Sequence, residues 1–194
     1  MGEKRKRIGV DIDDVVVEFY KKFLKPFNKK FGKQLAFHDL KTSKIWDFTN
    51  VSKEEVLSFL PEFHNAEHSG NVEIVNGAKN ALENINKKYD IFFITARPLS
   101  VKENTKKWLQ EIFNKFDFEI IFSDGLFDGA KTKGEICRET EIKIMIEDNP
   151  EYALDCGKNG IKTFLLDKPW NKNYSQHENL IKVKSWEEIV KSLN

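Results

Sequence analysis

The sequence predicts an α/β fold in which helices cover both faces of a parallel sheet. Between residues 77 and 193, short β-branched runs alternate with segments of helical periodicity, a pattern typical of parallel sheets. The early run Ile8-Gly9-Val10 is apolar without alternation, as expected for a strand that is buried on both faces. A chain of 194 residues with 40% hydrophobic residues is long enough for one substantial core and a small inserted subdomain.

The segment after the first strand is expected to be helical. Aromatic and aliphatic side chains recur with helical spacing between residues 15 and 31, and Pro26 interrupts them. This pattern predicts a kinked or broken amphipathic helix. Aromatic stripes of this kind more often pack in a core than contact a ligand.

The stretch from residue 32 to residue 76 contains no convincing strand. Trp46 and Phe48 lie in a loop-like segment, and Ser52 with Glu55 forms a capping box that begins a helix. We therefore predict a small all-helical cap over residues 17–76, inserted into a core formed by residues 1–16 and 77–194. An insertion directly after a strand that ends at a site is well placed to act as a lid.

The elements after Gly77 are expected in regular alternation. The expected helices cover residues 78–88, 101–115, 133–139, 152–158 and 186–193, and the expected strands cover residues 91–95, 119–122, 143–147 and 162–166. Ser185 is the expected N-cap of the last helix. Because these strands are parallel, their carboxyl ends meet at one edge of the sheet.

Polar side chains follow three of the expected strands. They are Asp11 and Asp13 after the first strand, Thr95 and Arg97 after the strand at 91–95, and Glu147 with Asp148 after the strand at 143–147. Crowded carboxylates raise one another's pKa and usually require a cation, most often a hard one such as Mg²⁺. Together with a lysine at the start of the helix at 133–139, these groups predict a phosphate site with a divalent ion.

Four motifs along the chain resemble, in order, those of the haloacid dehalogenase (HAD)-like superfamily. They are Asp11-Ile12-Asp13, Ile94-Thr95, a downstream lysine, and Ile146-Glu147-Asp148-Asn149-Pro150. The helical insertion and three further segments are most similar to the 5'(3')-deoxyribonucleotidases and their bacterial nucleotidase relatives. These segments are Thr95-Ala96-Arg97-Pro98, Lys168-Pro169-Trp170-Asn171 and Ser185-Trp186. The resemblance implies a three-layer α/β/α HAD-like Rossmannoid core with a small cap.

The resemblance also implies a Mg²⁺-dependent phosphatase that acts through an aspartyl-phosphate. Asp11 would be the nucleophile, and Asp13 would protonate the leaving alkoxide and later deprotonate water. Mg²⁺ would be held by the carboxylates of Asp11 and Asp148 and by the backbone carbonyl of Asp13, with Glu147 as a further candidate ligand.

Two more groups would contact the phosphoryl oxygens or the intermediate. Thr95 would donate its hydroxyl hydrogen, and a lysine would add positive charge. Lys133 is favoured for this role because a lysine in the first helical turn can point over the strand ends, and Lys131 is the alternative.

The expected substrate is a deoxyribonucleoside monophosphate. Phe19, Ile45 and Trp46 fall at places that resemble the base pocket of the deoxyribonucleotidases, and Arg97 is a candidate contact to the substrate phosphate. Two alternatives remain open at this point. One is a HAD phosphatase for another small metabolite phosphate, and the other is a receiver-like signalling module that carries a phospho-aspartate. The long insertion after the first strand argues against a receiver.

Several polar residues are expected to have structural roles. Asp14 stands where the nucleotidases often have a small residue, and it is expected to complement a helix dipole rather than to bind metal. Cys137 is expected in the core of a helix face. The four histidines, His38, His64, His68 and His177, show no metal-ligand spacing and are expected at the surface.

Composition and charge exclude several classes of partner. Lys and Arg number 32 against 31 Asp and Glu, so the net charge of +1 argues against a protein that coats nucleic acid polymers or anionic membranes. The two cysteines lack metal-type spacing, and no apolar stretch approaches the length of a membrane span. A cytoplasmic location and a small-molecule phosphate partner are therefore expected.

Overall fold

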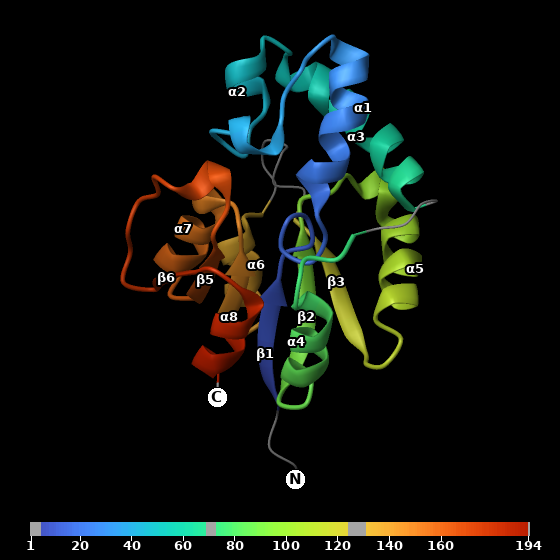
Figure 1. Cartoon of the computed structure of the whole chain (residues 1–194). Helices are drawn as coiled ribbons and strands as arrows, with labels where there is room; N and C mark the ends of the chain where they lie inside the picture. Colours follow the sequence, from blue (N-terminus) through green and yellow to red (C-terminus); the bar gives the residue numbers. More distant parts are fainter. Residues whose placement is uncertain (1–4, 69–72, 124–130, 194) are drawn as a thin grey trace.

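A six-stranded parallel sheet forms the centre of the molecule. The computed structural model describes residues 5–68, 73–123 and 131–193, so parts of the predicted core and cap at 1–4, 69–72, 124–130 and 194 lie outside the described residues (Figure 1). The sheet order is β3-β2-β1-β4-β5-β6. The strands are β1 (Lys6–Val10), β2 (Tyr89–Thr95), β3 (Phe118–Phe122), β4 (Ile144–Glu147), β5 (Lys162–Leu166) and β6 (Leu180–Val183).

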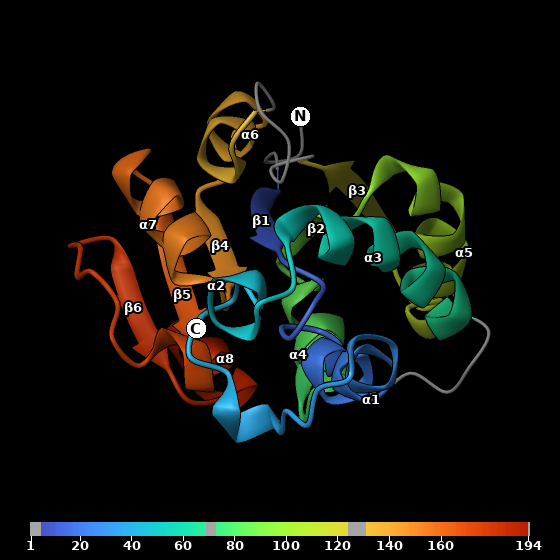
Figure 2. The same ribbon diagram turned by 90° about the horizontal axis from the view of Figure 1, so that it is seen from above.

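Helices cover both faces of this sheet. Side chains of α4 (Ala78–Ile85), α5 (Lys102–Ile112) and α8 (Trp186–Leu193) pack in one hydrophobic cluster against Ile8 and Phe93. Side chains of α6 (Lys133–Glu139) and α7 (Pro150–Lys158) pack on the opposite face against Phe92 and Met145 (Figure 2). The predicted three-layer α/β/α fold is therefore confirmed.

Strand β1 lies at the point where the strand order changes direction. It pairs with β2 on one side and with β4 on the other. Open parallel sheets bind ligands outside the carboxyl ends of strands at such a switch point. A Cβ atom at Gly9 would lie 2.7 Å from the sulfur of Met145, so a larger residue here would require the Met145 side chain to shift.

Four short elements lie over the carboxyl edge of the sheet (Figures 1 and 2). They are α1 (Phe19–Phe31), the 3₁₀ turn Phe37–Asp39, α2 (Trp46–Thr49) and α3 (Lys53–His68). Apolar side chains of these elements and of the loops between them pack together with Trp170 in a second hydrophobic cluster, which we call the cap cluster. Its buried members are Phe19, Tyr20, Phe23, Leu24, Phe27, Leu40, Ile45, Val51, Val56, Phe59, Leu60, Phe63 and Trp170, and Phe37 and Trp46 are among the side chains that pack against them. The limits of a separate cap at residues 17–76 stay a prediction.

The beginning of the first helix differs from the prediction. Helix α1 begins only at Phe19, because residues 14–16 form a turn in which Asp14 adopts a left-handed φ of 57° and Val17 forms a β-bridge with Ile74. The helix then continues through Pro26. Trp46, expected in a loop, begins the short helix α2, while Ser52 and Glu55 form the predicted capping box at 2.8 and 3.1 Å.

Strand β6 was not predicted from the sequence. This strand has four residues, pairs only with β5 at the edge of the sheet, and leaves Ile181 exposed. A short, partly exposed edge strand gives no continuous apolar run, so its sequence pattern is weak. By contrast, the bounds of α6, β5 and α8 agree with the prediction.

No helix within the described ranges is both long and apolar enough to cross a membrane. The cytoplasmic location stays a prediction.

Candidate active site

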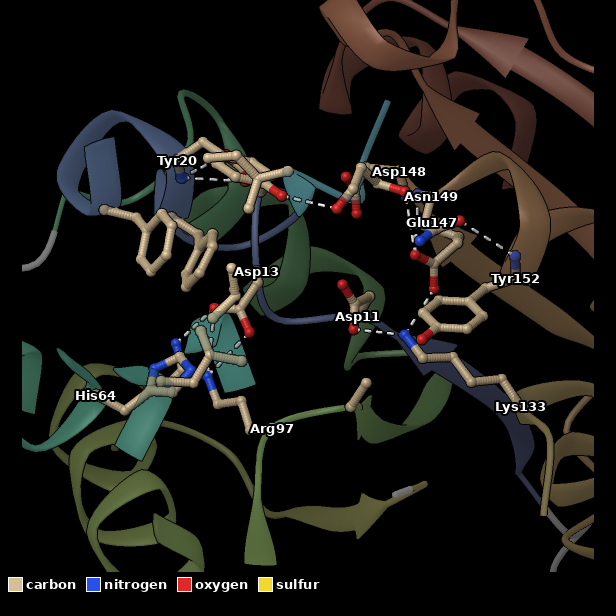
Figure 3. Close-up of a pocket in the computed structure, with 18 of the residues that line it drawn as sticks. Asp11, Asp13, Tyr20, His64, Arg97, Lys133, Glu147, Asp148, Asn149 and Tyr152 are labelled. Carbon is tan, nitrogen blue, oxygen red and sulfur yellow. Dashed lines mark hydrogen bonds and ion pairs between the residues drawn. The ribbon is translucent and has the colours of Figure 1, made fainter. Parts of the chain in front are cut away.

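A cavity lies between the carboxyl ends of the strands and the cap elements (Figure 3). Its floor is strongly charged, whereas its roof is largely apolar. Five carboxylates and two permanently cationic side chains line the floor: Asp11, Asp13, Asp14, Glu147, Asp148, Arg97 and Lys133. This excess of negative charge would repel an anionic ester unless a further cation were present.

Three of these carboxylates form a compact buried cluster. Asp11 directly follows β1, Glu147 is the last residue of β4, and Asp148 comes next. One oxygen from each lies within 4.8 Å of the other two. The pairing of β1 with β4 continues past the strands, because the Asp11 N–H donates to the carbonyl of Ile146 at 2.9 Å. Adjacent strand ends therefore bring the three acids together.

Lys133 lies against this cluster. Its Nζ donates to Oδ1 of Asp11 at 2.6 Å and to Oε2 of Glu147 at 2.8 Å. Lys133 is the first residue of α6, where Thr132 and Glu135 form a capping box that fixes the start of the helix. Lys131, the alternative, is mostly exposed and pairs with Glu139 at 2.6 Å. The structure thus brings Lys133, and not Lys131, to the acidic cluster.

The charge of Lys133 is too small to balance the three buried carboxylates, as the pKa values of the cluster indicate. Burial and the charge of Glu147 raise the pKa of Asp11 to about 8, although Lys133 acts in the opposite direction. Burial, Glu147 and Asp11 raise the pKa of Asp148 well above its usual value. Burial alone would lower the pKa of Lys133, but Asp11 and Glu147 raise it well above its usual value. These three oxygen donors suit a hard divalent cation.

Asp13 points away from this cluster, toward Arg97 (Figure 3). The Nε and one terminal nitrogen of Arg97 donate to the Asp13 carboxylate at 3.0 and 2.6 Å. The guanidinium is buried and lies over the ring of Trp108 at 5.1 Å. Burial raises the pKa of Asp13, but the charge and hydrogen bonds of Arg97, together with His64 and Lys133, outweigh burial, so the pKa of Asp13 lies below the usual value. The side chain of Asp13 is therefore paired with Arg97. The predicted Mg²⁺ ligand at this residue is its backbone carbonyl, and that contact stays a prediction.

Thr95 ends β2 and is completely buried. Its Oγ1 accepts the backbone N–H of Arg97 at 3.1 Å, and its carbonyl accepts the backbone N–H of Ser123 at 2.8 Å. The neighbouring residues Ala96 and Arg97 line the cavity, whereas Thr95 is not among its lining residues. The predicted contact of Thr95 with phosphate stays a prediction.

Asp14 lies beside the cluster but belongs to the start of α1. Its carboxylate accepts the backbone N–H of Tyr20 at 3.1 Å, which agrees with the expected place at a helix N-terminus. Burial raises the pKa of Asp14 well above its usual value. Asp14 is not part of the group of three acids that could share one ion among the described residues.

The roof of the cavity contains the predicted cap residues. Phe19, Ile45 and Trp46 all line it, together with Tyr20. Phe19 stacks on Phe23 with ring centroids 5.0 Å apart, so it also takes part in the packing of the cap cluster.

His64 is a cavity residue that the sequence analysis placed wrongly at the surface. It is only 2% exposed and lies near Asp13 and Arg97, with its ring 5.6 Å from that of Phe19 (Figure 3). The missed signal was periodicity, because His64 follows Val56 and Leu60 at intervals of four residues and therefore shares their helix face.

Comparisons with known proteins show the family of this chain. The model of the family "5' nucleotidase, deoxy (Pyrimidine), cytosolic type C protein" matches residues 5–193. A Bacillus cereus protein with the name "Putative nucleotidase" is 29% identical, and the match covers 94% of this chain and 95% of the relative. A 5'(3')-deoxyribonucleotidase of Clostridium acetobutylicum is 25% identical, with 93% and 91% covered.

The fold is also similar to that of a solved HAD protein. The crystal structure of YfnB from Bacillus subtilis, a "putative HAD-hydrolase" bound to magnesium, superposes with a TM-score of 0.65 at 16% identity. The match covers 98% of this chain and all of that chain. With the match of the family model over nearly the whole sequence, the chain belongs to the cytosolic type C family of deoxy (pyrimidine) 5' nucleotidases, phosphomonoester hydrolases of the HAD-like superfamily.

Proposed function

We propose that this protein is a Mg²⁺-dependent phosphatase that releases phosphate from deoxyribonucleoside monophosphates through an aspartyl-phosphate on Asp11. The observation that carries the proposal is the contact of Lys133 with Asp11 and Glu147, beside Asp148, at the switch point of the sheet. The family match and the name of the Clostridium relative support a nucleotide as the substrate.

The residues present fit a divalent cation. Asp11, Glu147 and Asp148 offer three buried oxygen donors within 4.8 Å of one another, and one lysine cannot balance their charge. These residues would hold Mg²⁺, with the backbone carbonyl of Asp13 as a further ligand. The bound ion would supply positive charge that lets the Asp11 carboxylate approach an anionic phosphate.

The chain's own residues then divide the chemistry. A carboxylate oxygen of Asp11 attacks phosphorus, and the bond between phosphorus and the ester oxygen breaks. Arg97 turns from Asp13 to the substrate phosphate, which removes the charge that lowers the pKa of Asp13 and lets Asp13 take up a proton from solvent. Asp13 gives this proton to the leaving alkoxide, which departs as the nucleoside. Asp13 then takes a proton from water, whose oxygen attacks phosphorus and releases inorganic phosphate and the free carboxylate of Asp11. Lys133 keeps Asp11 oriented throughout and offsets charge on the phosphoryl group.

The cap residues support a nucleoside as the leaving group. Phe19 and Trp46 present aromatic surface to the cavity, and Tyr20 adds a third ring. Stacking of a base on an aromatic side chain contributes about 1–3 kcal/mol. A sugar phosphate without a base would gain none of this energy.

A panel of phosphate esters tests the proposal. We would measure release of inorganic phosphate from dUMP, dTMP and a set of sugar phosphates, each with Mg²⁺. We expect kcat/KM to be highest for the deoxynucleotides. Equal or faster hydrolysis of sugar phosphates would favour the other metabolite phosphatase. A stable phosphoprotein without turnover would favour the receiver-like module.

A further inference from the structure

We infer that Trp170 is a positioning residue that joins Asp148 to the packing of the cap, so that metal binding and cap packing are coupled. This inference rests on the proposed function, because it treats Asp148 as a metal ligand. Trp170 lies in the segment Lys168-Pro169-Trp170-Asn171, to which neither the proposed reaction nor the substrate contacts assign a role.

On the core side, Trp170 fixes the orientation of the Asp148 carboxylate. Its indole N–H donates to Oδ2 of Asp148 at 2.9 Å. The next residue, Asn171, donates from Nδ2 to the backbone carbonyl of Asp148 at 2.8 Å and to that of Leu166 at 2.8 Å. The side chain and the backbone of Asp148 are therefore held by two consecutive residues of the same turn.

That turn is itself anchored to the core. The Asn171 side-chain oxygen accepts the backbone N–H of Lys168 at 3.0 Å, and its backbone carbonyl accepts a hydrogen bond from Lys182 of β6 at 2.9 Å. Asn171 is completely buried. Trp170 therefore extends from a turn that hydrogen bonds anchor to the core, and this anchoring restricts the position of its ring.

On the cap side, the same indole ring is part of the cap cluster. Trp170 is 4% exposed, and its ring lies 5.0 Å from that of Tyr20 and 5.6 Å from that of Phe37, both in edge-to-face geometry. Among the described members of the cap cluster, Trp170 is the one that lies outside residues 17–76. One side chain thus contacts both an acid of the cluster and the aromatic packing above it.

This double contact predicts reciprocal coupling. Donors that orient a metal ligand typically change metal affinity about 10–100-fold when they are lost. If a bound ion fixes Asp148, it also fixes Trp170 and the rings of Tyr20 and Phe37. By linkage, the factor by which metal binding favours the ordered packing of the cap equals the factor by which this packing strengthens metal binding. A change that loosens the packing of the cap should therefore weaken metal binding.

The test uses the full chain and compares two tryptophan-to-phenylalanine variants. Trp170→Phe keeps an aromatic ring beside Tyr20 and Phe37 but removes the N–H donor to Asp148. Trp186→Phe is the matched control, because Trp186 is also buried and its indole N–H donates to the carbonyl of Val15 at 2.9 Å, away from the three acids. Each variant loses one buried hydrogen bond of an indole N–H, to a carboxylate in Trp170→Phe and to a backbone carbonyl in Trp186→Phe.

We would measure Mg²⁺ affinity by isothermal titration calorimetry and hydrogen exchange of α1 with and without Mg²⁺. We expect Trp170→Phe to bind Mg²⁺ about tenfold more weakly and Trp186→Phe to stay within about twofold of the wild type. Mg²⁺ should slow exchange in α1 of the wild type and of Trp186→Phe, and this protection should be lost in Trp170→Phe. Saturating Mg²⁺ should restore the activity of Trp170→Phe.

Two results would overturn the inference. They differ in whether the wild-type protein binds Mg²⁺ and hydrolyses phosphate esters. If the wild type binds Mg²⁺ and hydrolyses dUMP while Trp170→Phe has unchanged affinity and α1 protection, the role of Trp170 is wrong and the proposed function stands. If the wild type neither binds Mg²⁺ nor hydrolyses any ester, the proposed function and the inference fail together.

Discussion

The Nζ atom of Lys133 lies 2.6 Å from Oδ1 of Asp11, and both side chains are almost completely buried. The two residues are 122 positions apart in the chain. They meet because β1 pairs with β4 and because the capping box at Thr132 fixes the start of α6. This contact separates Lys133 from Lys131 and gives the nucleophile of the proposed reaction a fixed partner.

Replacement of Lys133 should damage turnover much more than replacement of Lys131. Lys133→Met keeps the length of the side chain but removes the charge beside Asp11, so we expect kcat/KM to fall at least about 100-fold. Lys131→Met removes a surface pair with Glu139 and should leave kcat/KM within about twofold of the wild type. Steady-state kinetics with dUMP check both variants, and similar losses in both would refute the assignment.

Asp11→Asn should abolish turnover while the fold stays intact. The change removes the nucleophile's charge with little change of shape, and we expect kcat to fall at least about 1,000-fold. Far-UV circular dichroism and the melting temperature of the metal-free protein are the controls for folding. Near-normal activity of this variant would disprove the role of Asp11.

Metal binding should tighten as pH rises. Burial and neighbouring carboxylates raise the pKa of Asp11 to about 8 and raise that of Asp148 above its usual value. The metal-free protein therefore holds a proton on Asp11 at neutral pH. Mg²⁺ must displace this proton, so its affinity should increase up to about pH 8 and binding should release protons. Calorimetry in two buffers with different ionisation enthalpies measures this release. Full activity after removal of Mg²⁺ by EDTA would contradict the metal requirement.

The ion pair of Arg97 with Asp13 should stabilise the protein in a pH-dependent way. The pKa of Asp13 is lowered in the folded state, so its stabilisation is present above the unfolded pKa and is lost as pH falls through the folded pKa. Arg97→Met should therefore lower the free energy of unfolding by about 2–4 kcal/mol at pH 7. Urea unfolding at pH 7 and at pH 3 provides the comparison, and a difference that does not shrink at low pH would contradict this account.

Trp46 should matter only for substrates that contain a base. Loss of one stacking contact of about 1–3 kcal/mol predicts a decrease in kcat/KM of about 5- to 150-fold for dUMP in Trp46→Ala. Deoxyribose 5-phosphate, which has the same ester without the base, should be hydrolysed at the wild-type rate. An equal loss for both substrates would indicate a structural role for Trp46.

Local patterns were sufficient to predict most of the core. Helical periodicity located α6, and the apolar run of β5, which polar residues bound, located that strand. The edge strand β6 was missed because three of its four side chains are partly or fully exposed and one of these is Lys182, so its apolar pattern is broken.

The candidate site was only partly predictable for a different reason. Strand ends converge by topology, which brought Asp11, Glu147 and Asp148 together as expected. The direction of the Asp13 side chain depends on its tertiary contact with Arg97, and no local pattern at Asp13 encodes it. The burial of His64 was signalled by its spacing from Val56 and Leu60, but that spacing does not show that this helix face meets the cavity.

Direct detection of phosphorylated Asp11 tests the central claim most closely. The wild-type protein would be mixed with dUMP and Mg²⁺, quenched in acid within milliseconds and reduced with borohydride, which converts an aspartyl-phosphate to homoserine. Peptide mass spectrometry should find homoserine at position 11 in the wild type and none in Asp11→Asn. Rapid release of phosphate with homoserine at another position, or with no modified residue, would contradict the proposed mechanism.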